Sequence, residues 1–198
     1  MRTTKSGTGN LGNTGRGVFI GNGASNNLIG DNDLGDGLTN AANIIAYNGL
    51  WGVDVSGASS TGNSILRNSS FSNARTGINL GGVPNDPGDA DTGPNNLQNY
   101  PLITSAKTGR RATTIKGTLE STPKGSFTIW FFKNPKSTKE EGKKFIGYEN
   151  VTDTDGDGII PFTFKPTKKV KAGLFVTALV TNDGGDTSEF SAPKKVRG

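Results

Sequence analysis

The segment Asp153-Thr154-Asp155-Gly156-Asp157-Gly158 has the clearest spacing for chemistry in this sequence. Carboxylates at alternate positions followed by a glycine match the first six positions of a calcium loop, because the glycine permits the sharp turn that lets several oxygens reach one cation. The bidentate glutamate of such a loop is missing at the twelfth position, where Phe164 stands. The segment is therefore either a weak calcium site or a Gly-Asp hairpin between two strands.

A second acidic cluster spans six residues near the middle of the chain and consists of Asp86, Asp89 and Asp91. Carboxylates this close repel one another unless a cation or hydrogen-bond donors neutralise them. Asn85 and Asn95 flank the cluster. We therefore expect either a structural calcium ion that stabilises this part of the chain or a set of capped turns.

Lysine side chains form a third candidate feature, because 14 of the 15 lysines follow residue 100. They lie in three groups: Lys136, Lys139, Lys143, Lys144; Lys165, Lys168, Lys169, Lys171; and Lys194, Lys195. A basic face attracts anionic polysaccharide, lipid head groups or nucleic acid through salt-sensitive contacts. No nucleic-acid motif accompanies the lysines. We expect either solvated loops or binding of an acidic polysaccharide or cell-envelope polymer.

The composition excludes several kinds of chemistry. The 198 residues include no cysteine and no histidine, so the chain has no thiol or imidazole catalyst, no disulfide and no zinc site of the usual kind. Apolar residues make up 31% of the sequence, so the fold must rely heavily on backbone hydrogen bonding. No stretch reaches the ~20 apolar residues of a spanning helix, and the first ten residues lack the apolar core of a secretion signal.

The two halves of the chain differ in composition. Residues 1–100 contain 19 of the 30 glycines, 17 of the 20 asparagines, five basic and seven acidic residues. Residues 101–198 contain eight of the ten phenylalanines, 17 basic and ten acidic residues. This shift predicts two domains, 1–100 and 101–198, joined by a turn-rich segment around residues 84–101.

A repeat is the most specific feature of the first half. Its unit is an asparagine, three residues, a glycine and then apolar-any-apolar, and it begins at Asn13, Asn48 and Asn73. A period near 25 residues with short alternating apolar runs favours a solenoid of short strands over helical pairs. We expect about three turns of a right-handed parallel β-helix, with asparagines stacked at the corners and tolerating left-handed backbone there. The surplus residues of the first copy, 30–40, read as one inserted loop.

The second half reads as antiparallel strands. We expect strands at 113–119, 126–133, 144–151, 159–166 and 174–181, and a last strand near Glu189. Alternation such as Phe162 and Phe164 favours two packed sheets, each with one solvent-facing side. Burial of about eight phenylalanines, at ~2 kcal/mol each, would allow this half to fold alone.

Both halves resemble known architectures. The segments 17–20, 27–30, 43–45 and 85–95 resemble bacterial right-handed parallel β-helix repeat proteins, which are large, secreted, surface-associated chains with the pectate-lyase-like fold. The segments 127–135 and 187–191 resemble the immunoglobulin-like β-sandwich module that closes such chains. The resemblance implies an extracellular or cell-surface location, with the export signal outside this chain. It implies little about activity, because the fold serves lyases, hydrolases, adhesins and stalks alike.

The resemblance raises the question of a lyase, in which calcium held by several aspartates binds an acidic sugar and an arginine or lysine removes a proton. Only Asp54 with Arg75 or Arg67 imitates that arrangement, and one aspartate is too few. Residues 1–100 contain no glutamate, so paired carboxylates of the hydrolase type are also missing. Trp51 either stacks on a sugar or covers a corner of the solenoid.

The sequence thus predicts an all-β chain, a short β-helix followed by an antiparallel immunoglobulin-like sandwich. An open solenoid end exposes strand edges, so we expect the chain to be the C-terminal piece of a longer solenoid or to self-associate through residues 3–30. We assign no catalytic residue and leave open whether the chain is an enzyme. The expected function is a structural or adhesive module of a large exported bacterial surface protein; the alternative is a polysaccharide lyase or carbohydrate-binding protein acting on acidic polysaccharide.

Overall fold

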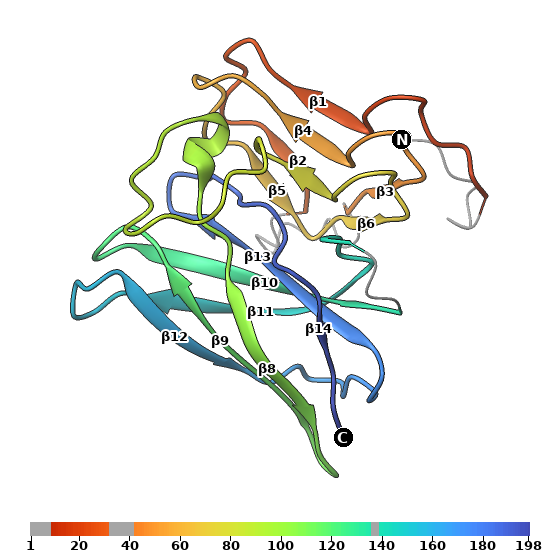
Figure 1. The fold of residues 1–198 in the computed structure, drawn as a ribbon, viewed down its shortest axis with the longest axis vertical. Coiled ribbons are helices and arrows are strands. Elements are labelled where there is room, and N and C mark those ends of the chain that lie inside the picture. The colour runs from red at the N-terminus through yellow and green to blue at the C-terminus, as the bar shows by residue number, and fades with distance from the viewer. Residues whose placement is uncertain (1–8, 32–41, 136–138) are drawn as a thin grey trace.

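A computed structural model describes residues 9–31, 42–135 and 139–198. The chain is all-β, with parallel sheets in its first half and antiparallel sheets in its second half (Figure 1). No helix among the described residues is long and apolar enough to cross a membrane. Three predicted features lie partly or wholly outside the described residues: positions 32–40 of the inserted loop 30–40, Lys136, and positions 3–8 of the segment expected to self-associate.

The first half forms three parallel sheets, which we call the parallel stack. Its strands are β1 (Val18–Ile20), β2 (Leu28–Gly30), β3 (Ile44–Ala46), β4 (Val53–Val55), β5 (Ser64–Leu66), β6 (Ser69–Phe71) and β7 (Ile78–Asn79). The sheets have the orders β1-β4-β7, β2-β5 and β3-β6. The register aligns Val18 with Val53 and Val53 with Ile78, so each copy of the sequence repeat lies directly above the next.

Asparagine side chains form the predicted ladders at the corners of the stack. The Nδ2 of Asn48 donates to the Oδ1 of Asn73 at 2.8 Å, and the Nδ2 of Asn43 donates to the Oδ1 of Asn68 at 3.0 Å. The expectation of left-handed backbone at the ladder asparagines is wrong for these four residues, although Asn95, which continues a ladder, has φ 47°. The left-handed residue is instead the one before Asn48, Asn68 and Asn73, as at Tyr47 (φ 60°). Arg67 and Ser72 occupy the same position before Asn68 and Asn73, with φ 58° and 57°.

Glycine begins each repeat strand because the backbones of successive copies approach closely. A Cβ atom at Gly17 would lie 2.5 Å from the carbonyl oxygen of Gly52, and one at Gly52 would lie 2.5 Å from that of Gly77. Neither Gly17 nor Gly52 has a positive φ. The repeat therefore requires glycine at this position for space between stacked chains and not for backbone conformation.

The second half forms two antiparallel sheets. Its strands are β8 (Leu102–Thr108), β9 (Thr113–Glu120), β10 (Ser126–Asn134), β11 (Lys144–Thr152), β12 (Ile159–Phe164), β13 (Phe175–Asn182) and β14 (Lys194–Lys195). We call the sheet of order β12-β9-β8 the outer sheet and the sheet of order β11-β10-β13-β14 the middle sheet. Five predicted strands are confirmed within a few residues, whereas β8 was not predicted.

The strand expected near Glu189 is wrong, because the last strand is β14. The segment around Glu189 does run beside β13, but serine hydroxyls take part in the pairing. Ala178 N–H donates to the Oγ of Ser191 at 2.9 Å, and Val180 N–H donates to the Oγ of Ser188 at 3.0 Å. These side-chain acceptors replace backbone carbonyls, so no regular ladder forms there.

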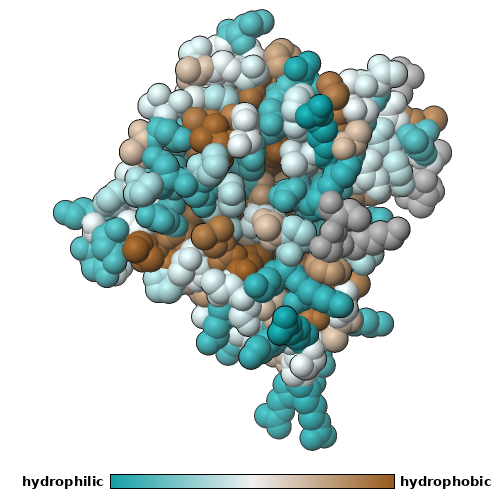
Figure 2. All heavy atoms as spheres, viewed as in Figure 1, coloured by the Kyte–Doolittle hydropathy of each residue, from teal (hydrophilic) through white to brown (hydrophobic). Residues whose placement is uncertain are grey.

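The strands β10 and β13 of the middle sheet are buried on both faces, which contradicts the expectation of one solvent-facing side for each sheet. Ile129 and Phe131 of β10 pack in a core against the outer sheet, whereas Trp130 and Phe132 pack in a core with the parallel stack. Figure 1 shows the resulting three layers: the parallel stack, the middle sheet and the outer sheet. The space-filling view shows mostly hydrophilic residues on this face, with the apolar ones in small groups (Figure 2).

The second half also supplies the hydrogen-bond partners for the last turn of the parallel stack. Ser70 N–H donates to the carbonyl of Gly142 at 2.9 Å, and Gly77 N–H donates to the carbonyl of Glu140 at 2.8 Å. Ile65 N–H donates to the Oγ1 of Thr187 at 3.0 Å. Residues 139–143 and 185–188 thus stand where a further turn of the stack would place its strands.

Candidate functional site

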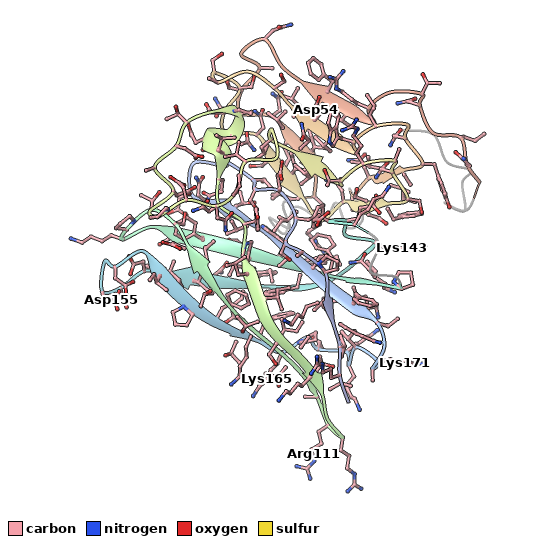
Figure 3. The ribbon with its side chains drawn as sticks, viewed as in Figure 1. Asp54, Arg111, Lys143, Asp155, Lys165 and Lys171 are labelled. Atoms are coloured by element: carbon pink, nitrogen blue, oxygen red, sulfur yellow. The ribbon has the colours of Figure 1, made fainter. Side chains whose placement is uncertain are left out.

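The sequence-predicted site residues lie in different parts of the fold. Figure 3 shows Asp54 in the parallel stack and Asp155 at the turn between β11 and β12. The cluster of Asp86, Asp89 and Asp91 lies in the connection between β7 and β8. No single cleft gathers these groups, so each is described by its own surroundings.

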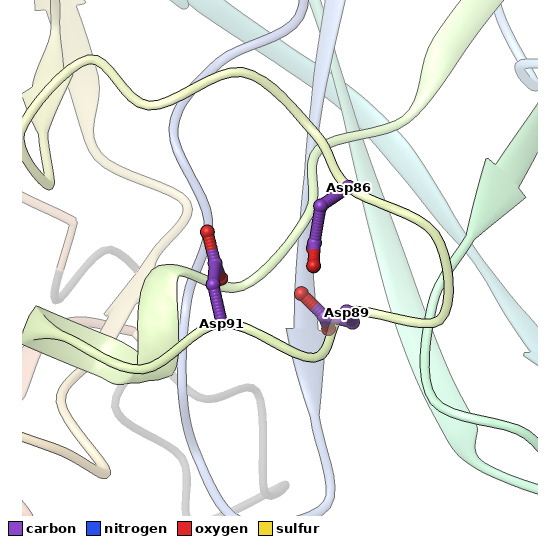
Figure 4. A group of neighbouring side chains, drawn as sticks. All are labelled: Asp86, Asp89 and Asp91. Carbon is purple, nitrogen blue, oxygen red and sulfur yellow. The ribbon is translucent and has the colours of Figure 1, made fainter.

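The carboxylates of Asp86 and Asp89 point toward each other, and Asp91 lies beside them (Figure 4). One oxygen from each lies within 4.8 Å of the others. The segment from 83 to 94 reaches this arrangement by folding back on the chain before β8. Asp86 N–H donates to the Oδ1 of Asn99 at 3.1 Å, and the Nδ2 of Asn99 donates to the carbonyl of Asp86 at 2.7 Å.

Asp89 has partners on both carboxylate oxygens. Its Oδ2 accepts hydrogen bonds from the Oγ of Ser121 at 2.6 Å and the Nε2 of Gln98 at 2.5 Å. Its Oδ1 accepts from Asn99 N–H at 2.8 Å. These donors tie the acidic segment to residues that flank β8 and β9. Gln98 lies in the predicted junction, whereas no sequence pattern marks Ser121.

Asp86 and Asp91 each keep one oxygen without a partner. The Oδ1 atoms of both residues are buried and accept no hydrogen bond from the described residues. A buried carboxylate oxygen without a partner loses its hydration and gains nothing in return, which costs on the order of 1–3 kcal/mol or more. Within the described residues, neither carboxylate forms an ion pair with a lysine or arginine. The cluster therefore has acceptor capacity that the protein does not use.

The protonation of the cluster reflects this lack of positive charge. Burial raises the pKa of Asp89, and the charges of Asp86 and Asp91 raise it further, although the hydrogen bonds from Ser121 and Asn99 act in the opposite direction. Burial and the charge of Asp86 also raise the pKa of Asp91. A divalent cation among the oxygens would reverse these shifts, because it stabilises the ionised forms. Hard oxygen donors of this kind are those that Ca²⁺ prefers.

Asn95, which the sequence places beside this cluster, does not contribute to it. The side chain is buried and continues the corner ladder of the parallel stack. Its Oδ1 accepts from Asn63 N–H at 3.1 Å, and its Nδ2 donates to the carbonyls of Asn63 and Thr187 at 2.8 and 3.0 Å. Asn95 thus links the stack to the second half.

The turn with Asp153, Asp155 and Asp157 also brings one oxygen of each carboxylate within 4.8 Å of the others. The strands it joins, β11 and β12, belong to different sheets, so the turn is not a hairpin between paired strands. Asp153 accepts from the N–H groups of Lys124, Gly156 and Gly158 at 2.8, 2.9 and 3.0 Å.

These backbone donors explain the acidity of Asp153. The hydrogen bonds from Lys124 and Gly156, with a smaller one from Gly158, lower the pKa of Asp153 to about 2 although burial opposes the shift. Both oxygens of Asp153 have donors, and the side chains of Asp155 and Asp157 are exposed. Asp153 therefore caps this turn without needing a cation.

Asp54 is buried and has partners other than those the lyase comparison requires. Its side chain forms an ion pair with the guanidinium of Arg16, and its Oδ1 accepts from the Nδ2 of Asn79 at 2.6 Å. Arg67 instead pairs with Asp31 at 3.2 Å. Sequence reasoning missed Arg16, whose position immediately before Gly17 matches that of Trp51 before Gly52 in the repeat.

Trp51 lies against two arginines on the outside of the parallel stack. The guanidinium of Arg75 lies 4.8 Å from the ring centroid of Trp51, and that of Arg16 lies 5.8 Å from it. The guanidinium of Arg16 also lies 4.7 Å from the ring centroid of Phe19. These cation–π contacts stabilise the outside of the sheet β1-β4-β7.

The three lysine groups of the sequence do not form three basic surfaces. The Nζ of Lys139 donates to the carbonyls of Asn73 and Ala74 at 2.7 and 2.6 Å, so Lys139 links the two halves. The Nζ of Lys143 lies 4.3 Å from the ring centroid of Phe71. The Nζ of Lys169 donates to the carbonyl of Arg110 at 3.0 Å.

Comparison with known proteins gives no assignment. No protein-family model matches the chain, and no curated protein is significantly similar to it.

Proposed function

We propose that this chain is a non-enzymatic structural or adhesive module of a large exported bacterial surface protein. In this proposal the parallel stack is the end of a right-handed parallel β-helix, and the two antiparallel sheets are an immunoglobulin-like sandwich that closes it. A calcium ion held by Asp86, Asp89 and Asp91 stabilises the connection between them. The site of action is the cell surface or the extracellular space.

The core shared by the two halves is the observation that carries this proposal. Trp130, Phe132, Leu179 and Phe190 from the second half pack in one cluster with the aliphatic side chains of the parallel stack. A solenoid with an exposed end leaves apolar side chains and strand edges in water, which favours aggregation. Covering that end with a folded sheet produces a rigid joint, as a mechanical surface element requires.

Buried polar contacts support the same joint. The carboxylate of Glu141 accepts hydrogen bonds from the N–H groups of Asn73 and Ser72 at 2.8 and 3.0 Å, below the last ladder asparagine. The carboxylate of Glu189 accepts from Leu80 N–H at 2.7 Å. Each glutamate of the second half thereby satisfies backbone donors at the end of the stack.

The cation is proposed at the cluster of Asp86, Asp89 and Asp91 and not at Asp153. Only the former cluster keeps buried oxygens without donors in the described part of the chain. Asp89 is already held by hydroxyl and amide donors, so the site would bind calcium weakly. Extracellular modules bind calcium with Kd values of roughly 0.1–1 mM, so a weak site suits a protein outside the cell.

A lyase is the less supported candidate. The one arrangement that imitates it needs Asp54 beside Arg75 or Arg67, and Asp54 is instead buried with Arg16 and Asn79. A buried and paired carboxylate is not available to hold a cation at the surface.

The joint is tested by calorimetric unfolding of the intact chain. If the halves share one core, the protein unfolds in one transition whose calorimetric and van't Hoff enthalpies agree. Two separated transitions would show that the halves fold independently and would remove the support for a rigid joint.

A further inference from the structure

The solvent-facing side of the outer sheet carries a basic hollow to which no role has yet been given. The hollow has a volume of about 470 Å³ and is lined by Ser105, Lys107, Thr114, Lys116, Thr163 and Lys165. Three lysines and three hydroxyl residues thus line one surface, which contains no carboxylate. The residues come from β8, β9 and the end of β12, so the strand pairing alone brings them together.

The register of the sheet explains the arrangement. Lys116 of β9 pairs with Ser105 of β8 on one side and with Thr163 of β12 on the other. In the neighbouring row, Lys107 pairs with Thr114. Paired residues project from the same face, and strands lie ~4.8 Å apart. Each of these two lysines therefore has a serine or threonine beside it on the neighbouring strand, so cations and hydroxyl groups alternate across the surface.

The C-terminal segment extends this surface through an isolated bridge to β8. Arg197 forms a parallel bridge with Lys107, and Thr108 N–H donates to the carbonyl of Arg197 at 2.7 Å. A smaller adjoining hollow of about 190 Å³ is lined by residues that include Lys107, Lys194 and Arg197. The basic surface thus runs from Lys165 across three strands to Arg197.

These cations are exposed and lack acidic partners. Within the described ranges, the ion pairs of the chain are those of Arg16 with Asp54 and Arg67 with Asp31, so none involves the basic surface. Along β9 the first carboxylate is Glu120, four residues from Lys116 and about 13 Å away at the rise of a strand. Figure 3 shows Lys165 on the outer sheet and Arg111 at the tip of the β8–β9 hairpin, both away from the parallel stack.

We propose that this surface binds a linear acidic polysaccharide that carries carboxylates, and this proposal rests on the adhesive role proposed above. The lysines pair with the carboxylates of the polymer, and Ser105, Thr114 and Thr163 exchange hydrogen bonds with its sugar hydroxyls. Each contact is weak, but a repeating polymer engages several cations at once, so avidity supplies the affinity.

The lining of the hollow favours a polysaccharide over a single-stranded nucleic acid. Proteins that bind single strands without sequence preference use aromatic side chains on which bases stack. The hollow has no aromatic residue in its lining, and Phe162 and Phe164 of β12 point into the core instead. Hydroxyl groups between the lysines match a ligand rich in hydroxyls.

Binding of the intact chain to immobilised polygalacturonate, in calcium-free buffer at low and at physiological salt, tests the proposal. Neutral dextran and single-stranded DNA serve as comparison probes. We expect binding to polygalacturonate that weakens with salt, no binding to dextran, and weaker binding to the DNA. The triple variant Lys107→Gln, Lys116→Gln, Lys165→Gln lowers the affinity roughly tenfold or more, because it removes three cations from one surface.

The matched control removes the same charge elsewhere. Lys124, Lys144 and Lys171 are exposed and outside both hollows, so the triple variant Lys124→Gln, Lys144→Gln, Lys171→Gln keeps most of the affinity. Equal losses in both triple variants, no binding of the wild type, or tighter binding to DNA through the same lysines would each overturn the proposal. None of these results alters the calorimetric test of the joint, so the two proposals fail separately.

Discussion

At the scale of single residues, the carboxylates of this protein differ in what neutralises them. Asp54 has an arginine, and Asp153 has three backbone N–H donors. Asp86 and Asp91 each keep a buried oxygen without a donor in the described chain. The spacing of aspartates in the sequence is similar in both clusters, so the difference arises from the tertiary partners and not from the motif.

Calcium should therefore stabilise the protein through one cluster and not the other. We expect calcium, added in excess to protein treated with a chelator, to raise the melting temperature by roughly 5–10 °C at a concentration 100 times its Kd. The variant Asp91→Asn abolishes this rise, because it removes a charged oxygen from the site.

The matched control for this titration is Asp155→Asn, which changes an exposed carboxylate of the other cluster. It should keep the full calcium-dependent rise in melting temperature. If Asp155→Asn abolished the rise and Asp91→Asn preserved it, the ion would bind at Asp153, Asp155 and Asp157 and the proposed site would be wrong. No rise in the wild type would exclude calcium from the proposal.

The glutamates at the joint predict a dependence of stability on pH. Burial raises the pKa of Glu141 above its ordinary value of 4.5, and the donors at Asn73 and Ser72 and the charge of Lys139 oppose the shift only in part. The folded protein therefore binds this proton more tightly than the unfolded chain. The stabilisation from protonation is complete below the unfolded-state pKa and is lost as the pH rises through the raised pKa.

This sign can be checked with Glu141→Gln, in which the group no longer titrates. We expect the free energy of unfolding of the wild type, relative to this variant, to fall as the pH rises from below 4.5 through the raised pKa of Glu141. Glu189, whose pKa burial also raises, provides a second variant, Glu189→Gln, with the same expected sign. A difference that grows with pH for both variants would contradict the account.

At the scale of elements, the repeat predicts the parallel stack because its spacing fixes the register. Asparagines 25 residues apart reappear as hydrogen-bonded pairs, as with Asn48 and Asn73. The two-sided burial of β10 is harder to predict, although four apolar residues in succession, 129–132, are typical of a strand covered on both faces. The alternation in the neighbouring strands pointed to a two-layer sandwich instead.

The candidate sites show the same limit. Asp86, Asp89 and Asp91 are close in sequence, so their proximity could be predicted, but Ser121 is brought to Asp89 only by the fold. Lys107, Lys116 and Lys165 are far apart in sequence, and their common surface depends on the register of three strands. Lysine groups that are contiguous in sequence proved a poor guide, since Lys139 points to the parallel stack.

Substitution of a stacking glycine tests the geometry of the repeat. Gly52→Ala places a Cβ atom 2.5 Å from the carbonyl oxygen of Gly77 and 2.9 Å from the Oγ of Ser70. We expect a loss of about 2 kcal/mol or more in the free energy of unfolding, because backbone must move. Gly15→Ala, with no atom within 4 Å of the added Cβ, should change it by less than about 0.5 kcal/mol.

Denaturant titration of both variants measures the difference. Equal stabilities for Gly52→Ala and Gly15→Ala would show that successive copies of the repeat are not in close backbone contact.

At the scale of the whole molecule, the middle sheet makes the two halves interdependent. Phe132 is fully buried, and its ring lies 5.3 Å from that of Phe190, in the core shared with the parallel stack. The change from parallel to antiparallel pairing falls near residue 100, but neither part has this core to itself. The two halves are therefore connected through packed side chains.

The chain offers one tryptophan in each half to test this directly. Trp51 lies in the parallel stack, and Trp130 lies in β10, where its Nε1 donates no hydrogen bond to the described residues. Trp130→Phe therefore leaves Trp51 as a reporter of the first half without breaking a hydrogen bond to the described residues, and Trp51→Phe leaves Trp130 as a reporter of the second.

The decisive measurement is urea unfolding of each variant, followed by tryptophan fluorescence and by circular dichroism on the same samples. In both variants we expect the two signals to change at the same urea concentration, because the halves unfold as one cooperative unit. Loss of the Trp51 signal at a urea concentration where the Trp130 signal and most of the strand content persist would contradict this expectation.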